Sequence, residues 1–212
     1  MHMSDRPSNE ELLRRALERL DSFDYIHEDS IPAIDLYMDQ VTTFMDSHLS
    51  ATRRREEDKV LTKAMINNYA KNDLLPPPVN KKYSKNHILQ LIFIYYLKSF
   101  LSISDIEATL GPVAEEFWGE ASDLSFAEIY RNIFSHSEED MEQIRQDLES
   151  KFETAKSLYT DQPEKRRDKL QLFTFLCLID YDIFMKKQAV LSILDQLGEE
   201  ESEADKKSRK KK

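Results

Sequence analysis

The sequence predicts an all-α protein. Glycine is scarce, with 3 in 212 residues, and only 7 prolines interrupt the chain. The long stretches between them are rich in Leu, Glu, Lys, Gln and Ala, which have high helix propensity. Apolar residues recur in many of them at the three- and four-residue spacing of a helix face. Folds built on tight turns or phosphate-binding glycine loops need more glycine than this chain has.

Two helices are predicted in the first quarter of the chain. Ser8 is a suitable N-cap for a helix over residues 9–22, with an acidic capping-box partner three residues later. Pro32 is expected to open the second helix, because proline is favoured in the first helical turn. The charged segment 50–59 then predicts a loop or a solvated extension of that helix. The apolar stripe of the second helix consists of Ile34, Tyr37, Met38, Val41, Met45 and Leu49.

The middle of the chain predicts three capped helices and one turn. Three consecutive prolines, 76–78, end the first helix, and Gly111-Pro112 is expected to stop the third. Residues 79–83, between the first and second helices, predict a short extended turn or hairpin. The caps and helices are Thr62 for residues 63–72, Ser84 for 85–99 and Ser102 for 103–110.

The last part of the chain predicts further helices over residues 126–133, 138–159 and 164–197, with Pro163 breaking the last two apart. Residues 170–184 are apolar almost all round. A helix of that kind is buried inside a bundle or shared with a partner chain. The charged tail 198–212 lacks apolar residues and is expected to be disordered.

The distribution of charge is more informative than the net charge of −10. Residues 50–100 hold ten Lys and Arg against four Asp and Glu, whereas the rest of the chain is strongly acidic. A basic segment on an acidic body is typical of a protein with one face that meets phosphates, and a plain solvated patch is the alternative. Within this segment, Arg53-Arg54-Arg55 is followed at once by Glu56-Glu57-Asp58 and predicts a self-neutralising loop.

Several classes of protein do not fit. The single cysteine, Cys177, excludes a disulfide framework within the chain, and the five histidines show no ligand spacing. No glycine-rich phosphate loop, nucleophile elbow or paired-carboxylate cleft is visible, so we expect neither an enzyme nor a cofactor or metal. The apolar runs are shorter than the ~20 residues that span a bilayer. We therefore expect a soluble, cytoplasmic protein without membrane contact.

The basic segment resembles a known DNA-binding family. The run Met65-Ile-Asn-Asn-Tyr-Ala-Lys-Asn-Asp-Leu-Leu-Pro-Pro77 is similar to the recognition-helix signature of MerR-type winged helix-turn-helix regulators. The whole sequence also resembles a bacterial domain family of unknown function that shares this core. The resemblance implies a winged domain over residues 31–112. Residues 81–84, 91–98 and 102–106 also carry the MerR-type resemblance, and residues 36–40 and 61–63 carry the pattern of the family of unknown function.

The rest of the chain is divided into segments on either side of the winged domain. An N-terminal helix within residues 1–30 precedes it. A C-terminal helical domain, 113–197, follows as a bundle or dimerisation region, and then the tail 198–212.

The same resemblance implies a set of DNA contacts. Asn67 stands where the family has a DNA-contacting arginine, and Asn68 stands where it has an aromatic residue. Lys81 and Lys82 fall on the basic wing. Asn can bond adenine bidentately, so base reading does not require the arginine. For most of these residues a solvated surface, and for Tyr69 a packing role, is the alternative. The predicted DNA-binding residues are Lys63, Asn67, Asn68, Tyr69, Lys71, Lys81, Lys82, Tyr83 and Lys85.

Three functions are consistent with these features. The first is a sequence-specific transcriptional regulator that binds double-stranded DNA as a homodimer joined through its C-terminal helices. The second is a helical protein-interaction adaptor that keeps the winged fold without DNA binding. The third is a sensor that holds an apolar effector in the aromatic-rich C-terminal bundle. A gel-shift screen separates the first two, and native mass spectrometry for a co-purified small molecule tests the third.

Overall fold

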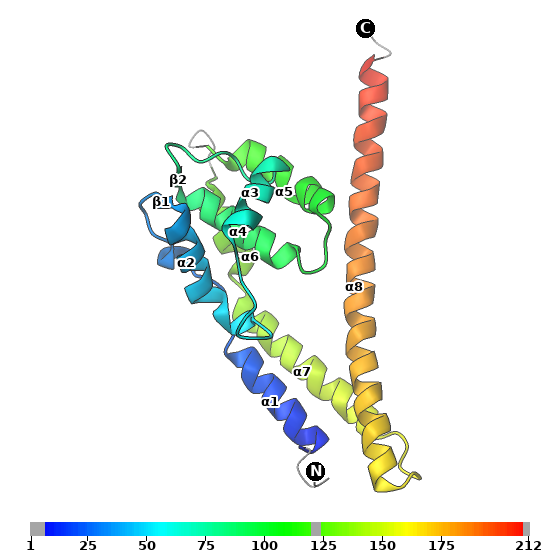
Figure 1. Ribbon diagram of the computed structural model, residues 1–212. Coiled ribbons are helices and arrows are strands. Elements are labelled where there is room, and N and C mark those ends of the chain that lie inside the picture. Colours follow the sequence, from blue (N-terminus) through cyan, green and yellow to red (C-terminus); the bar gives the residue numbers. More distant parts are fainter. Residues whose placement is uncertain (1–6, 120–123, 210–212) are drawn as a thin grey trace. The chain divides into compact units, whose positions relative to one another are not determined.

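The computed structural model describes residues 7–119 and 124–209, with the side chains of residues 199–209 left out. Its described part is mostly helical, as predicted, with one small antiparallel sheet (Figure 1). The chain forms two compact units, and the divisions between them fall after residues 24, 135 and 189. The first and third of the four segments therefore make up a different unit from the second and fourth.

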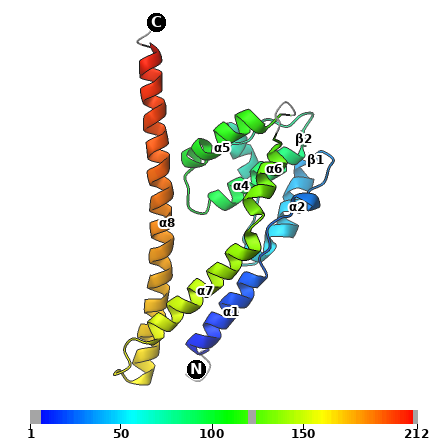
Figure 2. The ribbon, with the colours of Figure 1, turned by 180° about the vertical axis from the view of Figure 1, so that it is seen from behind.

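Unit 1 is built from three helices: α1 (Asn9–Asp21), α7 (Ser137–Lys156) and the first part of α8 (Glu164–Arg209). Helices α1 and α7 lie side by side, as Figures 1 and 2 show from opposite directions. The Ser8 hydroxyl oxygen accepts a hydrogen bond from the Glu11 backbone N–H at 3.1 Å, as expected for its N-cap role. The predicted helices 9–22 and 138–159 are confirmed with ends shifted by a few residues.

A small apolar cluster holds unit 1 together. Phe152 and Ala155 of α7 pack against Phe175 of α8, and the two aromatic rings meet edge to face at 5.3 Å between centroids. Edge-to-face contact is a favourable geometry for aromatic rings. Arg145 of α7 forms an ion pair with Asp21 of α1. The core of unit 1 is small, so most side chains of α8 are not covered by the other helices of this unit.

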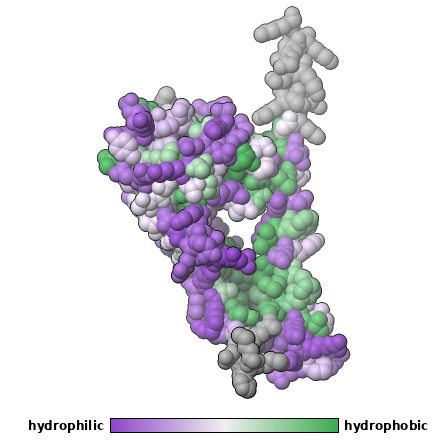
Figure 3. Space-filling model, in the orientation of Figure 1, coloured by the Kyte–Doolittle hydropathy of each residue, from purple (hydrophilic) through white to green (hydrophobic). Residues whose placement is uncertain are grey.

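Many large apolar side chains of α8 are exposed. Figure 3 shows hydrophobic side chains on the surface of this helix. The backbone of α8 also continues as helix through Gly198 to Arg209, which differs from the predicted disordered tail 198–212; residues 210–212 lie outside the described residues. The exposed apolar residues of α8 are Phe173, Leu176, Tyr181, Ile183, Phe184, Met185, Ile193 and Leu197.

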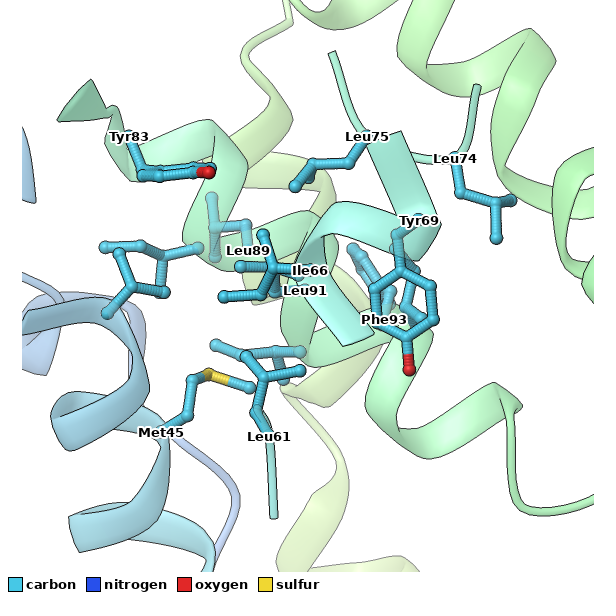
Figure 4. Packing of buried hydrophobic residues seen from close by; sticks show 14 of the residues in the cluster. Met45, Leu61, Ile66, Tyr69, Leu74, Leu75, Tyr83, Leu89, Leu91 and Phe93 are labelled. Carbon is cyan, nitrogen blue, oxygen red and sulfur yellow. The ribbon is translucent and has the colours of Figure 1, made fainter. Parts of the chain in front are cut away.

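Unit 2 contains the remaining helices, the sheet and the part of α8 from Val190 onward, where Val190, Leu191 and Leu194 pack against its core. Helix α4 lies in its core, because every side chain from His87 to Ile94 is buried. Figure 4 shows side chains of α2, α3 and α4 pointing into this core. The elements are β1 (Leu36–Tyr37), α2 (Met38–Leu49), α3 (Lys63–Lys71), β2 (Lys82–Tyr83), α4 (Lys85–Leu97), α5 (Ile103–Phe117) and α6 (Phe126–Phe134), with single 3-10 turns at Glu28–Ser30 and Ser50–Thr52.

The start of α2 differs from the prediction. The helix begins at Met38, after strand β1, and not at Pro32. Ile34 precedes it and is 70% exposed, so it does not belong to the buried stripe. The Tyr37 backbone N–H donates to the Gln40 side chain at 2.9 Å and so closes the first turn. The strand pairing with β2 holds this segment extended, which overrides the preference of proline for a first helical turn.

The end of α5 also differs from the prediction. The helix continues through Gly111 and Pro112 to Phe117, although proline leaves one helical carbonyl without its donor. Val113, Ala114 and Phe117 pack toward the core beyond the proline, and this burial favours continuation. Phe126 and Tyr130 of α6 are buried in the same core. Unit 2 therefore extends past the predicted boundary at residue 112.

Candidate nucleic-acid interface

Helix α3 begins and ends where the sequence predicts. The Thr62 hydroxyl oxygen accepts the Met65 backbone N–H at 3.2 Å. At the other end, Asp73 adopts a left-handed conformation with φ of 54°, and the Leu74 N–H donates to the Tyr69 carbonyl at 3.0 Å. This is the hydrogen bond of a Schellman-type C-cap. It turns the chain so that Leu74 enters the core.

The two sides of α3 have different surroundings. Ile66 and Tyr69 are buried on one side. Lys63, Asn67 and Lys71 are spaced four residues apart, so they share one side of the helix, and all three are exposed. The helix is thus anchored along one stripe and presents an amide and two ammonium groups along another.

A β-hairpin with a two-residue loop follows α3. Val79 and Lys82 exchange backbone hydrogen bonds of 3.1 and 2.9 Å. The two residues between them, Asn80 and Lys81, have φ angles of 52° and 64°. Positive φ at both central positions defines a type I′ turn, the turn whose twist matches that of paired strands. The predicted hairpin is confirmed, and Lys81 stands exposed at its tip.

The hairpin is attached to the start of α2 through the sheet. Strands β1 and β2 are antiparallel, with Leu36 opposite Tyr83 and Tyr37 opposite Lys82. The Lys82 ammonium lies 5.4 Å from the centroid of the Tyr37 ring, a cation–π contact. Tyr37 is 53% exposed and was predicted to lie on the buried stripe. Strand pairing, which short-range periodicity does not show, explains its exposure.

Two predicted contacts are buried. Tyr69 and Tyr83 are each only 4% exposed and lie in the core of unit 2. Burial raises the pKa of both phenols, because the charged form is disfavoured away from water. A side chain held in this way cannot reach a duplex. The packing role is therefore the better reading of these two tyrosines, and they are removed from the candidate interface.

Two of the predicted lysine contacts already have acidic partners. Lys63 forms an ion pair with Asp39 at the start of α2. Lys85 forms one with Glu28, a carboxylate that is 8% exposed and also binds Arg131 of α6. Lys85 and then Arg131 lower the pKa of Glu28. Lys85 therefore serves the packing of unit 2, whereas the Lys63–Asp39 pair is exposed and exchanges readily with solvent.

The acidic partners Asp39 and Glu28 were missed by sequence reasoning. Each lies far along the chain from the lysine that it binds, and no local pattern marks such a pair. Asn68 is exposed, as its predicted role as a DNA contact requires. Its backbone carbonyl also accepts a hydrogen bond from the Asn72 side chain at 2.7 Å, which the prediction did not include. Asn68 thus helps to end α3.

A buried histidine supports the base of the hairpin. The Ser84 backbone N–H donates to His87 Nδ1 at 3.0 Å, which closes the first turn of α4. The His87 ring packs edge-on against Trp118, with centroids 4.8 Å apart. Burial lowers the pKa of His87, and the Pro77 and Pro76 carbonyls and Asp35 only partly oppose this effect. His87 is therefore neutral at physiological pH.

No metal centre and no membrane segment is found among the described residues. Their His, Cys, Asp and Glu side chains form no group of three or more that could hold a metal ion. None of the described helices is both long and apolar enough to cross a membrane.

The comparison with protein families matches a family model to residues of unit 2. A model described as "Domain of unknown function (DUF1836)" matches residues 26–133. The chain belongs to the DUF1836 family. No curated protein and no solved structure matches the chain. The DUF1836 match covers β1, α2 to α5, the hairpin and all but the last residue of α6, and thus the whole candidate interface.

The limits of the DUF1836 domain agree with the core of unit 2. The match begins at Ile26, which is 2% exposed and whose carbonyl accepts the Tyr130 hydroxyl at 2.6 Å. It ends at Ile133, near the end of α6. The Ile26–Tyr130 hydrogen bond joins the two ends of the family domain.

Proposed function

We propose that this DUF1836 protein is a regulator that binds double-stranded DNA through α3 and the 79–83 hairpin. The observation that carries this proposal is the division of α3 into a buried side and an exposed side. Ile66 fixes the helix in the core, and Lys63, Asn67 and Lys71 point away from it. The major groove is about 12 Å wide and admits a helix presented in this way.

The order of elements supports the proposal. A strand, two helices, a hairpin and a further helix follow one another from β1 to α4, and β1 pairs with β2, the second strand of the hairpin. This order agrees with the MerR-like winged helix-turn-helix resemblance of residues 65–77. In that arrangement α3 is the recognition helix and the hairpin is the wing.

Each exposed residue then has a distinct role. Asn67, in the middle of the exposed stripe, reads an adenine edge through its amide. Lys71 and Lys63 contact phosphates on either side, with Lys63 leaving Asp39 to do so. Lys81 contacts the backbone from the tip of the hairpin. The rigid type I′ turn holds this lysine at a fixed distance from α3.

The proposal includes a second copy of the chain. The exposed residues Leu176, Ile183 and Leu197 of α8 belong to a seven-residue repeat with the partly buried Val190. A seven-residue apolar repeat is typical of helices that pair with other helices. A homodimer joined through α8 would offer two copies of α3 to half-sites one or more duplex turns apart.

DNA binding is tested through its salt dependence. A duplex is first selected by genomic footprinting, and its affinity is then measured by fluorescence anisotropy from about 50 to about 200 mM salt. Lys71→Ala and Lys81→Ala should each lower the salt slope by about one, because each removes one phosphate contact. Asn67→Ala should cost about 1–3 kcal/mol on the selected duplex and leave the slope unchanged.

The matched controls are Lys169→Ala and Asn132→Ala, which make the same chemical changes at exposed positions of α8 and α6. Neither control should alter affinity or slope. Absence of binding to any duplex at low salt would overturn the proposal. So would equal effects of Lys71→Ala and Lys169→Ala.

Pairing through α8 is tested by sedimentation. Ile183→Lys places a charge in the exposed apolar repeat and should convert a dimer into a monomer. Gln188→Lys adds the same charge at an exposed polar position nearby and should leave the dimer intact. A wild-type protein that sediments as a monomer at all concentrations would refute this part of the proposal.

A second candidate function is a protein-interaction adaptor. The exposed apolar surface of α8 and the ion pairs on Lys63 and Lys85 favour it. In that case the protein binds no genomic fragment at low salt and co-purifies with a protein partner, which is lost in Ile183→Lys.

A further inference from the structure

A hollow of about 480 Å³ lies beside the connection between α2 and α3. Its volume falls within the range of small-molecule sites. Figure 3 shows hydrophilic residues gathered over this connection. The hollow is bordered by four cationic side chains and one carboxylate: Arg53, Arg54, Lys59, Lys98 and Asp58. The sequence predicted a self-neutralising loop here, and Arg55 and Glu57 do form an ion pair within it, but Glu56 and Glu57 do not line the hollow.

Lys98 is a half-buried member of this set of cations. Its ammonium donates to the Val60 backbone carbonyl at 3.2 Å and lies 4.7 Å from the centroid of the Tyr95 ring. Within the described residues it forms no ion pair with a carboxylate. Burial accordingly lowers its pKa. A half-buried ammonium that forms no ion pair with a carboxylate is stabilised by an anion that enters beside it.

The other cations are arranged differently. Arg53 already forms an ion pair with Asp46. Its contribution to the hollow is therefore the positive electrostatic potential of its guanidinium group, and not a hydrogen bond to a ligand. Arg54 and Lys59 are exposed and have no carboxylate partner in the described part of the chain. Asp58 accepts the Arg55 backbone N–H at 3.0 Å, which holds this carboxylate on its own loop.

The remaining wall of the hollow is aromatic. Tyr95 and Tyr96 border it, and the Tyr95 hydroxyl is held by the hydroxyl of Thr52. Aromatic side chains and several cations around one hollow fit a ligand with an organic body and a phosphate group. A bare phosphate ion would fill only part of the volume.

We propose that this hollow binds the phosphate group of a small phosphorylated molecule, with Lys98, Arg54 and Lys59 as its donors and Tyr95 and Tyr96 beside its organic part. The site is separate from the exposed stripe of α3, so the proposal does not depend on DNA binding. The same chemistry could come from a phosphate of the DNA backbone, and the experiment includes that source as its own arm.

The test is calorimetric titration of the full chain with adenosine monophosphate and, separately, with inorganic phosphate at low ionic strength. Adenosine monophosphate should bind, and more tightly than inorganic phosphate, because it also meets the tyrosines. Lys98→Met keeps the length of the side chain and should weaken binding at least about ten-fold, since it removes a charged hydrogen bond. Lys169→Met on α8 is the matched control and should have no effect.

A second variant guards against loss of folding. Arg54→Gln with Lys59→Gln changes only exposed side chains, so it should fold normally and still weaken binding of adenosine monophosphate. Absence of heat with both probes, or affinities unchanged in both variants, would overturn the proposal. So would a result in which neither probe binds but Lys98→Met weakens binding of a duplex, because the phosphate would then be that of DNA.

Discussion

The ammonium group of Lys82 lies 5.4 Å from the centroid of the Tyr37 ring, across the pair of strands that joins the hairpin to the start of α2. The contact links Lys82 of the candidate interface to Tyr37, 45 positions earlier in the chain. It also keeps the Lys82 side chain over the ring and away from full exposure. The orientation of this lysine thus depends on Tyr37.

Replacement of Tyr37 measures that contact. Tyr37→Leu should lower the free energy of unfolding by about 0.5–1 kcal/mol, the range for exposed cation–π contacts. Tyr37→Phe keeps the ring and should leave the free energy of unfolding unchanged. Urea denaturation followed by circular dichroism provides both values. Equal losses in the two variants would show that the hydroxyl, and not the ring face, matters.

A stabilising change is expected at the end of α3. Asp73 has a φ of 54°, which glycine adopts without the cost that other residues incur. Asp73→Gly should therefore raise the free energy of unfolding by about 1 kcal/mol. Lys71→Gly, two residues earlier and inside the helix, should lower it by about 0.5–1 kcal/mol. Thermal or urea unfolding of both variants shows whether the two changes in unfolding free energy have opposite signs. A lower free energy of unfolding in both variants would contradict this account of the C-cap.

The buried side of α3 should dominate its contribution to stability. Ile66 has no exposed surface, and Ile66→Ala should lower the free energy of unfolding by about 2–5 kcal/mol. Ile34→Ala makes the same chemical change at a 70% exposed position and should stay within about 0.5 kcal/mol of the wild type. Comparable losses of unfolding free energy in the two variants, measured by urea denaturation, would contradict the exposure of Ile34 before α2.

His87 should make folding pH-dependent. Because burial holds its pKa in the folded protein below the unfolded value of about 6.5, the unfolded chain takes up a proton first as the pH falls. The free energy of unfolding should thus decrease below about pH 6.5, by up to about 1.4 kcal/mol per pH unit. His87→Gln removes the titrating group and keeps a side chain suited to the third position of a capping box.

The measurement is urea unfolding of both proteins at several pH values between about 7.5 and about 5.5, above the range where most carboxylates titrate. The wild-type free energy of unfolding should fall through this window, and that of His87→Gln should change less. Parallel curves for the two proteins would mean that His87 has the same pKa in both states.

Local sequence signals predicted the elements that end at strong caps. Thr62, the three prolines 76–78 and the short run 79–83 fix the bounds of α3 and the hairpin through interactions between residues close in the chain. The same signals placed Lys71 and Lys81 on the surface correctly. Caps and turns depend on a few neighbouring residues, so a single sequence is enough to predict them.

Elements that depend on distant partners were not predicted. Pairing with β2 holds Tyr37 extended, and burial of Ala114 and Phe117 carries α5 past Pro112. The ion pairs on Lys63 and Lys85 likewise join residues that are remote in the chain. In each case a tertiary contact outweighs a local preference, and the local sequence does not contain that contact.

The central place of α4 has a consequence for biosynthesis. Its apolar side chains from Ile88 to Ile94 are covered partly by α6, which a ribosome delivers roughly forty residues later. At about 5–20 residues per second, this delay lasts about 2 to 8 s. During that interval the nascent chain exposes a strongly apolar segment, so slow translation after α4 should increase its dependence on chaperones.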